Sequence, residues 1–197
     1  MITLYGFGRI FREGIGETKD LRVEWALQET GLPYRVHPLD HTAGELDSPA
    51  YSRISPFHQA PAIDDDGFIV AESGAALLYI AEKAGKLIPA DFEGRTRVVQ
   101  WCFAALSTVA PTLSLVSLGD IAGLKDEGRE LWDKLARRWL DGLGRRLGGR
   151  EWIACKDFTV ADILLATVLR EVRNTDLMAP YPRVKDFYSR ALARPAW

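Results

Sequence analysis

Three residues in the first half of the chain, Pro61, Glu72 and Ser73, have types and spacing that suit the binding of a small polar ligand. Ser73 comes just before a stretch of helical spacing, residues 75–84, so its backbone lies where a helix is expected to begin. Helix starts present free N–H groups and a positive potential, which a serine hydroxyl can cap or share with a bound carboxylate. We therefore expect a ligand cradle here rather than a purely structural segment.

Short segments with clear patterns surround these residues and would position them. Two apolar runs are joined by the pair Asp66-Gly67, which is typical of a tight hairpin turn, and the helix that follows stops at Gly85. Upstream, two β-like segments flank a helical stretch. The order β-α-β followed by β-β-α predicts a small mixed sheet with helices packed on it. The predicted elements are strands 2–6, 34–39, 62–63 and 68–70 and helices 21–30 and 75–84.

The remainder of the chain has helical periodicity throughout. Pro89 interrupts regular pairing, so residues 86–91 read as a linker, and no strand pattern follows from residue 92 onward. Thr159 and Asp162 fit a capping box before the almost wholly apolar stretch 163–169, which suits a buried central helix. We interpret both of these polar residues as structural.

The order and separation of these motifs resemble the glutathione S-transferase superfamily over nearly the whole chain. In that family a loop proline precedes a hairpin, and a Glu-Ser pair opens the next helix, as Pro61, Glu72 and Ser73 do here. The segment 4–6 is similar to the first strand of the family, and 158–162 matches a signature of its second domain. The resemblance implies an α/β thioredoxin-like N-terminal domain, an all-α C-terminal domain and a homodimer. The corresponding ranges are 1–85, a linker 86–91, and 92–197.

The resemblance also implies how glutathione would be held. Glu72 would accept hydrogen bonds from the ligand's ammonium group, while the hydroxyl and N–H of Ser73 would hold its α-carboxylate. Pro61 would be the family's cis-proline, which lets the backbone of Ala60 pair with the cysteinyl part of glutathione like an added strand. Gln59 would assist at the glycyl end. Outside this context Ser73 would be a helix cap, Pro61 a trans turn residue and Gln59 an ordinary loop residue.

Chemistry would centre on the glutathione sulfur, because a free thiol with a pKa of about 8.5 is mostly protonated at neutral pH. In the family, a side chain near the end of the first strand or the start of the first helix stabilises the thiolate. Thr18 is the hydroxyl at the matching helix start and is the predicted catalytic residue, with Lys19 the nearest cation. The alternative role for Thr18 is a helix N-cap. Tyr5 is a second candidate activator, although a strand tyrosine usually packs as an aromatic.

The connection from the first strand to the first helix, Phe7 to Asp20, is fourteen residues long and exceeds the usual length in the family. Long loops are often functional, so this one could act as a lid or a ligand clamp. It lacks the Gly-Lys-Ser/Thr ending of a phosphate loop, so nucleotide binding is not expected. A small hydrophobic electrophile would meet the sulfur at a crevice between the domains. The predicted lining residues are Phe7, Phe11, Trp101, Phe103 and Ser107.

Composition limits the partners of the chain. The 197 residues are 47% hydrophobic and 26% charged, and 25 basic and 27 acidic side chains give a net charge of −2. This balance gives no bulk reason to expect nucleic acid or an anionic membrane as a partner. We expect no segment long enough to span a bilayer and no export signal. Cys102 and Cys155 lack a redox or metal spacing, so we expect a cytoplasmic protein without a bound metal.

Two functions from different classes fit these observations. The first is a glutathione transferase that stabilises the glutathione thiolate and directs it at an electrophilic carbon or a peroxide. The second is a non-catalytic glutathione-binding or protein-interaction module, in which the altered first loop no longer activates the thiol. A disulfide oxidoreductase is disfavoured, because no cysteine lies at the start of the first helix.

Overall fold

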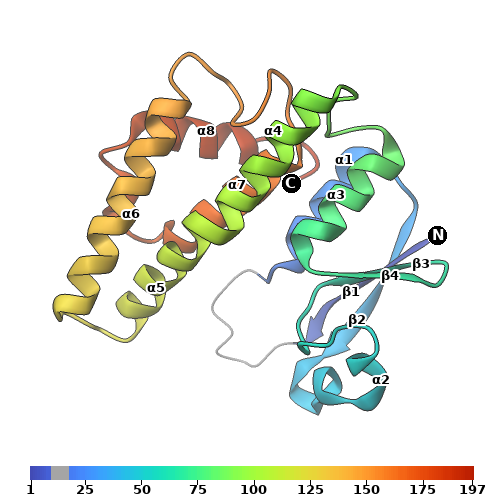
Figure 1. Ribbon diagram of the computed structural model, residues 1–197. Coiled ribbons are helices and arrows are strands. Elements are labelled where there is room, and N and C mark those ends of the chain that lie inside the picture. Colours follow the sequence, from blue (N-terminus) through green and yellow to red (C-terminus); the bar gives the residue numbers. More distant parts are fainter. Residues whose placement is uncertain (10–17) are drawn as a thin grey trace. The chain divides into compact units, whose positions relative to one another are not determined.

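The computed structural model of the chain describes residues 1–9 and 18–197, which form two compact units (Figure 1). The first unit covers Met1–Leu87 and the second covers Ile88–Pro195. The division falls within the segment 86–91 that the sequence indicates as a linker. Each unit has a core of its own, with a sheet in the first and helices alone in the second.

A four-stranded mixed sheet, with strand order β2-β1-β3-β4, forms the centre of the first unit. β1 (Ile2–Arg9) runs parallel to β2 (Tyr34–Asp40) and antiparallel to β3 (Ala62–Asp65), which pairs antiparallel with β4 (Phe68–Ala71). The β3–β4 turn places Asp66 at φ 53° and Gly67 at φ 97°. Aspartate and glycine tolerate positive φ better than most residues, which is why this pair closes the hairpin. The predicted mixed sheet and its hairpin are confirmed.

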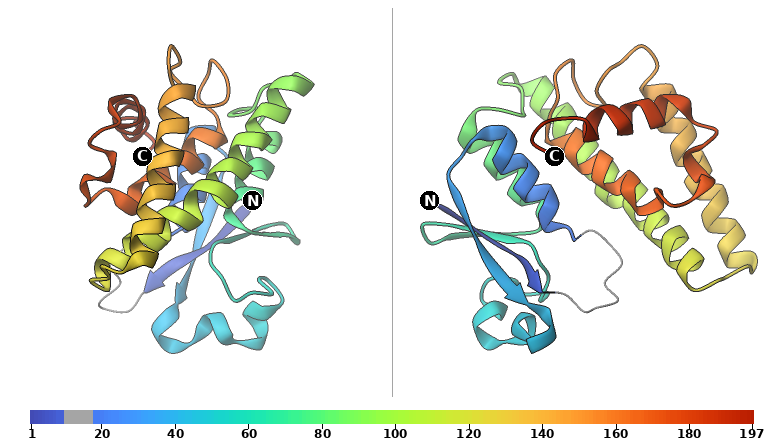
Figure 2. Two further views of the ribbon diagram at one scale, coloured as in Figure 1. Left: turned by 60° about the vertical axis from the view of Figure 1, so that its left-hand side comes forward. Right: turned by 180° about the vertical axis from the view of Figure 1, so that it is seen from behind.

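Helices cover the sheet on both sides (Figures 1 and 2). α1 (Asp20–Thr30) and α3 (Ser73–Ala84) lie side by side on one face, and the short α2 (Pro49–Ser52) lies on the other. Each long helix ends at a glycine in the left-handed conformation, because a residue without a side chain adopts it without steric cost. The apolar side chains shared by the sheet and these helices are buried, namely Ile2, Leu4, Ile63, Val23, Ala26, Leu27, Leu77 and Ile80.

The second unit consists of helices packed around α7. Nearly every residue of α7 (Val160–Leu169) is buried, as expected for an apolar stretch that forms the centre of a helical domain. The predicted class, a thioredoxin-like unit followed by an all-α unit, is therefore confirmed. The surrounding elements are α4 (Phe92–Phe103), a π-helical segment (Ala104–Val109), α5 (Ala110–Ile121), α6 (Glu127–Arg146) and α8 (Pro182–Leu192).

α4, the π-helical segment and α5 follow one another without a break, so residues 92–121 form one helical stretch. Pro111 lies in the first turn of α5, and a proline in a regular helix would clash with the carbonyl four residues earlier. The wider π turn just before it relieves that clash. With 30 residues and an apolar composition this stretch is long enough to cross a membrane, so the expectation that no segment has that length was wrong. Its inward side chains, including Val98, Ala105 and Leu113, are buried within the second unit.

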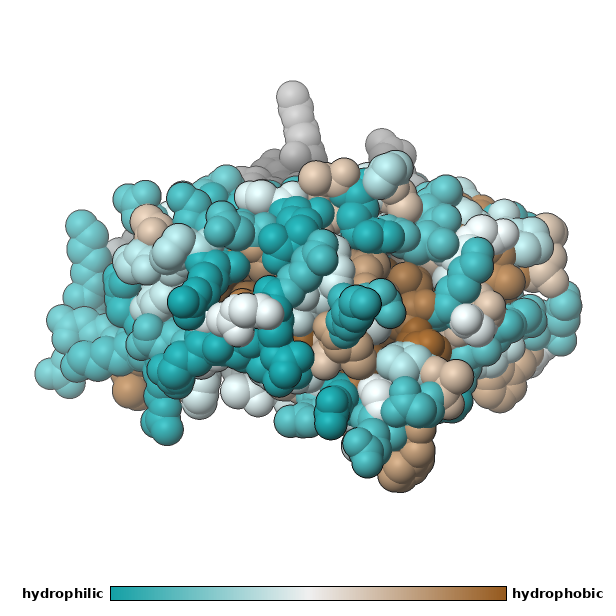
Figure 3. All heavy atoms as spheres, turned by 90° about the horizontal axis from the view of Figure 1, so that it is seen from above, coloured by the Kyte–Doolittle hydropathy of each residue, from teal (hydrophilic) through white to brown (hydrophobic). Residues whose placement is uncertain are grey.

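Hydrophilic side chains cover most of the face drawn in Figure 3, with apolar ones gathered in smaller patches. In the second unit, large apolar side chains are exposed along the stretch that contains α4 and α5. They include Phe92, Phe103, Leu118 and Ile121, which are 84%, 65%, 60% and 68% exposed.

Candidate functional site

One end of the sheet in the first unit brings the predicted ligand residues together. Ala62 at the start of β3 lies opposite Ala71 at the end of β4, so Pro61 and Glu72 lie just beyond the same residue pair. Ala62 also lies opposite Tyr5 of β1, so the last residues of β1 extend past this edge as well. The starts of α1 and α3 follow β1 and β4 in the chain. Strand pairing thus gathers segments that are more than fifty residues apart in the sequence.

The loop before β3 ends in a cis peptide between Ala60 and Pro61, as the family resemblance predicted. The residue before this pair, Gln59, has an exposed side chain but a backbone that is held on both sides. Its N–H donates to the Ser55 hydroxyl at 3.0 Å, and its carbonyl accepts from the Tyr51 hydroxyl at 3.0 Å. Both hydroxyl-bearing residues are buried, so the loop that presents Ala60 is fixed from beneath.

Tyr51 is suited to this task because it stays protonated. Burial, together with the negative charges that Tyr5, Glu45 and Asp20 can carry, raises the pKa of Tyr51 to about 12. At neutral pH the phenol therefore remains a donor to the Gln59 carbonyl. This role of Tyr51 was not predicted from the sequence, because nothing in a single tyrosine of a short helix indicates which carbonyl its hydroxyl contacts.

Glu72 occupies the N-cap position of α3 with φ 69° and ψ 120°, and its side chain makes no capping hydrogen bond. A positive φ is uncommon for a residue with a side chain, and such conformations concentrate at functional sites. The side chain is exposed, so its carboxylate can reach a ligand. The backbone carbonyl of Glu72 accepts the first hydrogen bond of the helix, from the Ala76 N–H at 2.9 Å.

Ser73 is the first residue of α3 and is 6% exposed. Because it lies after the N-cap, it is not the plain helix cap that its type alone would predict. Its Oγ atom instead accepts a hydrogen bond from Nη1 of Arg22 on α1, at 3.4 Å. The N–H groups of Ser73, Gly74 and Ala75 precede the first bond inside the helix, so they belong to the positive end of its dipole.

The start of α1 differs from the sequence prediction. The N-cap is Lys19, without a side-chain capping bond, so the alternative role of Thr18 as the cap was wrong. Thr18 directly precedes this position, and its catalytic role stays a prediction. The next residue, Asp20, accepts the Phe7 N–H on Oδ2 at 2.8 Å. A Cβ atom at Gly6 would lie 2.8 Å from that oxygen, so glycine leaves room for the carboxylate.

Asp20 therefore joins the end of β1 to the start of α1. Its second oxygen, Oδ1, is buried and has no hydrogen-bond partner among residues 1–9 and 18–197. Sequence analysis passed over Asp20, although an acidic residue in the first helical turn is a recognisable signal.

The residues predicted for the second substrate are distributed over both units. Phe7 is half-buried and packs against a cluster of buried residues in the first unit, and Phe11 lies outside the described residues. In the second unit Trp101 is half-buried, with the Arg146 guanidinium 5.3 Å from its ring centroid. Phe103 and Ser107 are exposed. The role of these residues in binding an electrophile stays a prediction.

Tyr5, the second candidate activator, and Cys102 both pack against other side chains of their units. Tyr5 packs against the same buried cluster as Phe7, with its ring 5.0 Å from His37 and 6.1 Å from Tyr51, which fits a packed aromatic. Cys102 is buried, and this burial raises the pKa of its thiol to about 12. The thiol is thus a poor nucleophile at neutral pH.

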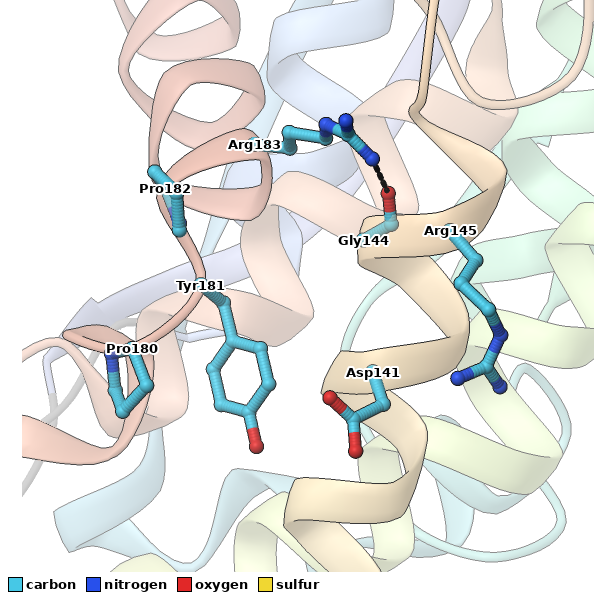
Figure 4. Close-up of a pocket in the computed structure, with 7 residues that line it drawn as sticks. All are labelled: Asp141, Gly144, Arg145, Pro180, Tyr181, Pro182 and Arg183. Carbon is cyan, nitrogen blue, oxygen red and sulfur yellow. Dashed lines mark hydrogen bonds between the residues drawn. The ribbon is translucent and has the colours of Figure 1, made fainter.

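A pocket of about 320 Å³ lies in the second unit, between α6 and the start of α8, and none of the predicted residues lines it (Figure 4). Arg183 reaches across to the carbonyl of Gly144, with an Nη1–O distance of 3.4 Å. The remaining lining residues are Asp141, Arg145, Pro180, Tyr181 and Pro182. No group of three or more His, Cys, Asp or Glu side chains suited to a metal occurs in the part of the chain that the structure describes.

Comparison with known proteins agrees with the fold. Family models described as the N-terminal and the C-terminal domain of glutathione S-transferase match residues 13–82 and 120–196. The disulfide-bond oxidoreductase YfcG of Escherichia coli is 31% identical over 180 residues, which cover 86% of this chain and 84% of that protein. The chain therefore belongs to the glutathione S-transferase superfamily.

Solved structures give the same result for the fold. A glutathione transferase family member from Pseudomonas fluorescens, crystallised with two glutathione molecules, has a TM-score of 0.86 and 28% identity. The alignment covers 99% of this chain and 89% of that one. A glutathione transferase from Pseudomonas putida, with one glutathione disulfide per subunit, has a TM-score of 0.86 and 26% identity, with coverage of 99% and 88%.

Proposed function

We propose that the chain is a glutathione transferase that binds glutathione and directs its sulfur at a small hydrophobic electrophile or a peroxide. The observation that carries this proposal is the position of the Ala60–Pro61 backbone at the same end of the sheet as Glu72 and the start of α3. An edge of backbone, a carboxylate and a helix start together match a zwitterionic tripeptide.

Each part of glutathione has a matching group in this proposal. The backbone of Ala60 pairs with the cysteinyl residue, and Tyr51 and Ser55 keep that edge in place through Gln59. Glu72 accepts from the ligand's ammonium group, since its side chain is exposed and makes no capping bond. The hydroxyl and N–H of Ser73 hold the α-carboxylate at the positive end of α3.

Thr18 is the proposed donor to the glutathione sulfur, because it directly precedes the start of α1 and its hydroxyl does not cap that helix. A donor to the thiolate lowers the pKa of the thiol and raises the fraction that can attack. Thr18→Ala should therefore raise the pH at which bound glutathione ionises. Thiolate absorbance in the ultraviolet, followed against pH, measures this shift, and an unchanged titration would remove Thr18 from the mechanism.

We also propose that the protein is a cytoplasmic homodimer. The exposed apolar side chains on α4, Phe92 and Phe103, favour a contact between copies of the chain. Light scattering on the purified protein should give twice the 22.0 kDa mass of one chain, and a single-chain mass would contradict the dimer.

Disulfide reduction by glutathione is a second candidate, favoured by the name of the relative YfcG and by the glutathione disulfide in the Pseudomonas putida structure. The first unit contains no cysteine, so the electrons would come from two glutathione molecules. One thiolate would attack the substrate disulfide and release a thiol, and the second would then attack the mixed disulfide. The products are glutathione disulfide and two thiols. This route answers the objection that no cysteine lies at the start of α1.

Turnover with glutathione separates these candidates. A transferase should conjugate small aromatic electrophiles or reduce a hydroperoxide. The second candidate should reduce a small dialkyl disulfide and form glutathione disulfide. Activity with a disulfide alone would replace the first proposal by the second. Glutathione binding measured by calorimetry, without turnover of an electrophile, a peroxide or a disulfide, would identify a non-catalytic binding module. Absence of binding would refute all of them.

A further inference from the structure

We propose that Arg22 is a positioning residue for Ser73, which it orients to donate to the α-carboxylate of bound glutathione. The inference rests on the proposed function, because it concerns how the same site distinguishes a carboxylate. It assigns a role to a side chain that lies on α1, far from Ser73 in the sequence and on a different helix.

The placement of Arg22 is unusual for a residue of its type. Arginine is almost never fully buried in folded proteins unless it is paired, yet Arg22 is only 5% exposed. It lies on α1, which packs directly against α3, and its Nη1 atom lies 3.4 Å from Oγ of Ser73. Ser73 is equally buried, at 6% exposed. The contact therefore lies beneath the start of α3.

The direction of this hydrogen bond follows from chemistry alone. A guanidinium group has five N–H donors and no acceptor, so the Ser73 oxygen must be the acceptor. A hydroxyl that accepts in this way keeps its own hydrogen for another partner. A carboxylate is acceptor-only when ionised, so it is the complementary partner for that hydrogen. Arg22 thus favours the orientation of Ser73 that binds an anion.

Electrostatics acts in the same direction. The guanidinium is permanently charged, and it lies beside the positive end of the α3 dipole. Both charges favour an anion at this point, and a buried environment strengthens hydrogen bonds that polarise one another. Ser73 is bonded from behind by a cation and faces the ligand with its N–H and hydroxyl. The predicted effect is selective affinity for the α-carboxylate of the γ-glutamyl group.

The chain offers a matched control for this contact. Arg35 on β2 donates from Nε to the hydroxyl of Thr3 on β1 at 3.0 Å, and Thr3 is buried as well. These two residues lie opposite each other in the parallel strand pair β1–β2. This second arginine–hydroxyl pair belongs to the same unit but is not at a helix start. Arg35→Met therefore reports what the loss of such a pair does to the fold alone.

The experiment measures two ligands by calorimetry: glutathione, and an analogue with 4-aminobutyrate in place of the γ-glutamyl residue. The analogue keeps the ammonium group and lacks the α-carboxylate. Loss of one charge-assisted hydrogen bond should make Arg22→Met bind glutathione about 10-fold more weakly and change the analogue by less than about twofold. Arg22→Lys should recover part of the loss, because lysine can also donate to Ser73. Arg35→Met should leave both affinities within about twofold of the wild type.

A double-mutant cycle completes the test. In a Ser73→Ala background, Arg22→Met should change glutathione affinity by less than about twofold, because the group that it orients is gone. Equal losses for both ligands, or no loss for either, would overturn the role of Arg22 while leaving glutathione binding intact. A wild-type protein that binds neither ligand would instead refute the proposed function, and this inference with it. If Arg22→Met does not fold, Arg22→Lys and Arg22→Gln allow the same comparison.

Discussion

The starts of α3 and α7 contain the same two kinds of residue, a hydroxyl and a carboxylate, but they use them differently. At α7, Asp162 accepts the N–H of Thr159 and the N–H of Ile153, both at 2.8 Å, so that the helix start is closed within the protein. At α3, the carboxylate of Glu72 is exposed and the hydroxyl of Ser73 contacts Arg22. The polar groups at the start of α7 are paired within the protein, whereas the start of α3 leaves a carboxylate exposed, where a ligand can reach it.

The order of the residues explains the difference. At α7 the hydroxyl residue is the N-cap and the acid follows at the third helical position, which is the arrangement of a capping box. At α3 the acid is the N-cap and makes no side-chain capping bond, and the serine is the first helical residue, so the pattern of a capping box is absent. The order of the same two residue types therefore distinguishes the capping box of α7 from the start of α3, where the proposed function places glutathione.

The largest effect on the free energy of unfolding should come from disrupting the capping box at the start of α7. Asp162→Ala leaves the buried N–H groups of Ile153 and Thr159 without an acceptor, which should lower the free energy of unfolding by roughly 2 to 6 kcal/mol. Urea unfolding followed by circular dichroism measures this change. A loss below that of a typical surface substitution would mean that the capping box does not hold α7 in place.

The stability of the protein should also depend on pH through Asp162. Burial raises the pKa of Asp162 to about 6 from its ordinary value of 3.8, so the folded protein holds this proton more tightly than the unfolded chain does. The contribution to stability is therefore full at pH values below the ordinary pKa and is lost as pH rises through the folded pKa. The pKa difference corresponds to about 3 kcal/mol. We expect the stability difference between wild type and Asp162→Asn to fall by this order between pH 4 and pH 7; a flat difference would contradict the shift.

Substitutions at the start of α3 should change ligand affinity more than those at the start of α7 do. Glu72→Ala and Ser73→Ala should each weaken glutathione binding by roughly 1 to 3 kcal/mol if they make charged hydrogen bonds to the ligand. The free energy of unfolding should change by less than about 1 kcal/mol in Glu72→Ala, because that side chain is exposed and does not cap α3. Ser73→Ala should lower it by roughly 1 to 3 kcal/mol, because the buried Arg22 loses a hydrogen-bond acceptor. Calorimetry and urea unfolding of the same samples separate the two quantities. Binding that is unchanged in both variants would remove α3 from the site.

The smallest effect should come from the support beneath the loop. Tyr51→Phe removes the hydroxyl that donates to the Gln59 carbonyl and keeps the buried ring, so it should lower both glutathione affinity and stability by about 1 kcal/mol. The matched control is Tyr34→Phe. The hydroxyl of Tyr34 is remote from the loop and donates to Glu24. Equal effects of the two variants on affinity would show that Tyr51 has no special role.

The features that the sequence predicted correctly depend on local patterns. Asp66-Gly67 determines its turn through its own backbone preferences, and Thr159 and Asp162 lie within one helical turn of each other. The cis state of Pro61 is different, because most X-Pro bonds are trans and only the family resemblance indicated otherwise.

The features that the sequence did not predict depend on contacts between distant segments. Arg22 meets Ser73 across 51 residues, and Asp20 meets Phe7 across a long connection, so no local pattern indicates either pair. The role of Thr18 as a cap failed for a simpler reason, since helix boundaries inferred from periodicity are uncertain by one or two residues. Likewise, α4 and α5 join through a π turn that has no sequence signal apart from Pro111.

The absence of cysteine from residues 1–87 has a consequence for how the protein withstands oxidants. No disulfide can form between side chains of that unit, so an oxidant cannot lock the cradle through a cysteine pair of its own. In the proposed function, reactive sulfur would enter and leave with the tripeptide, and each turnover would begin from the same protein. Supply of reduced tripeptide, rather than repair of the polypeptide, would then set how long catalysis lasts.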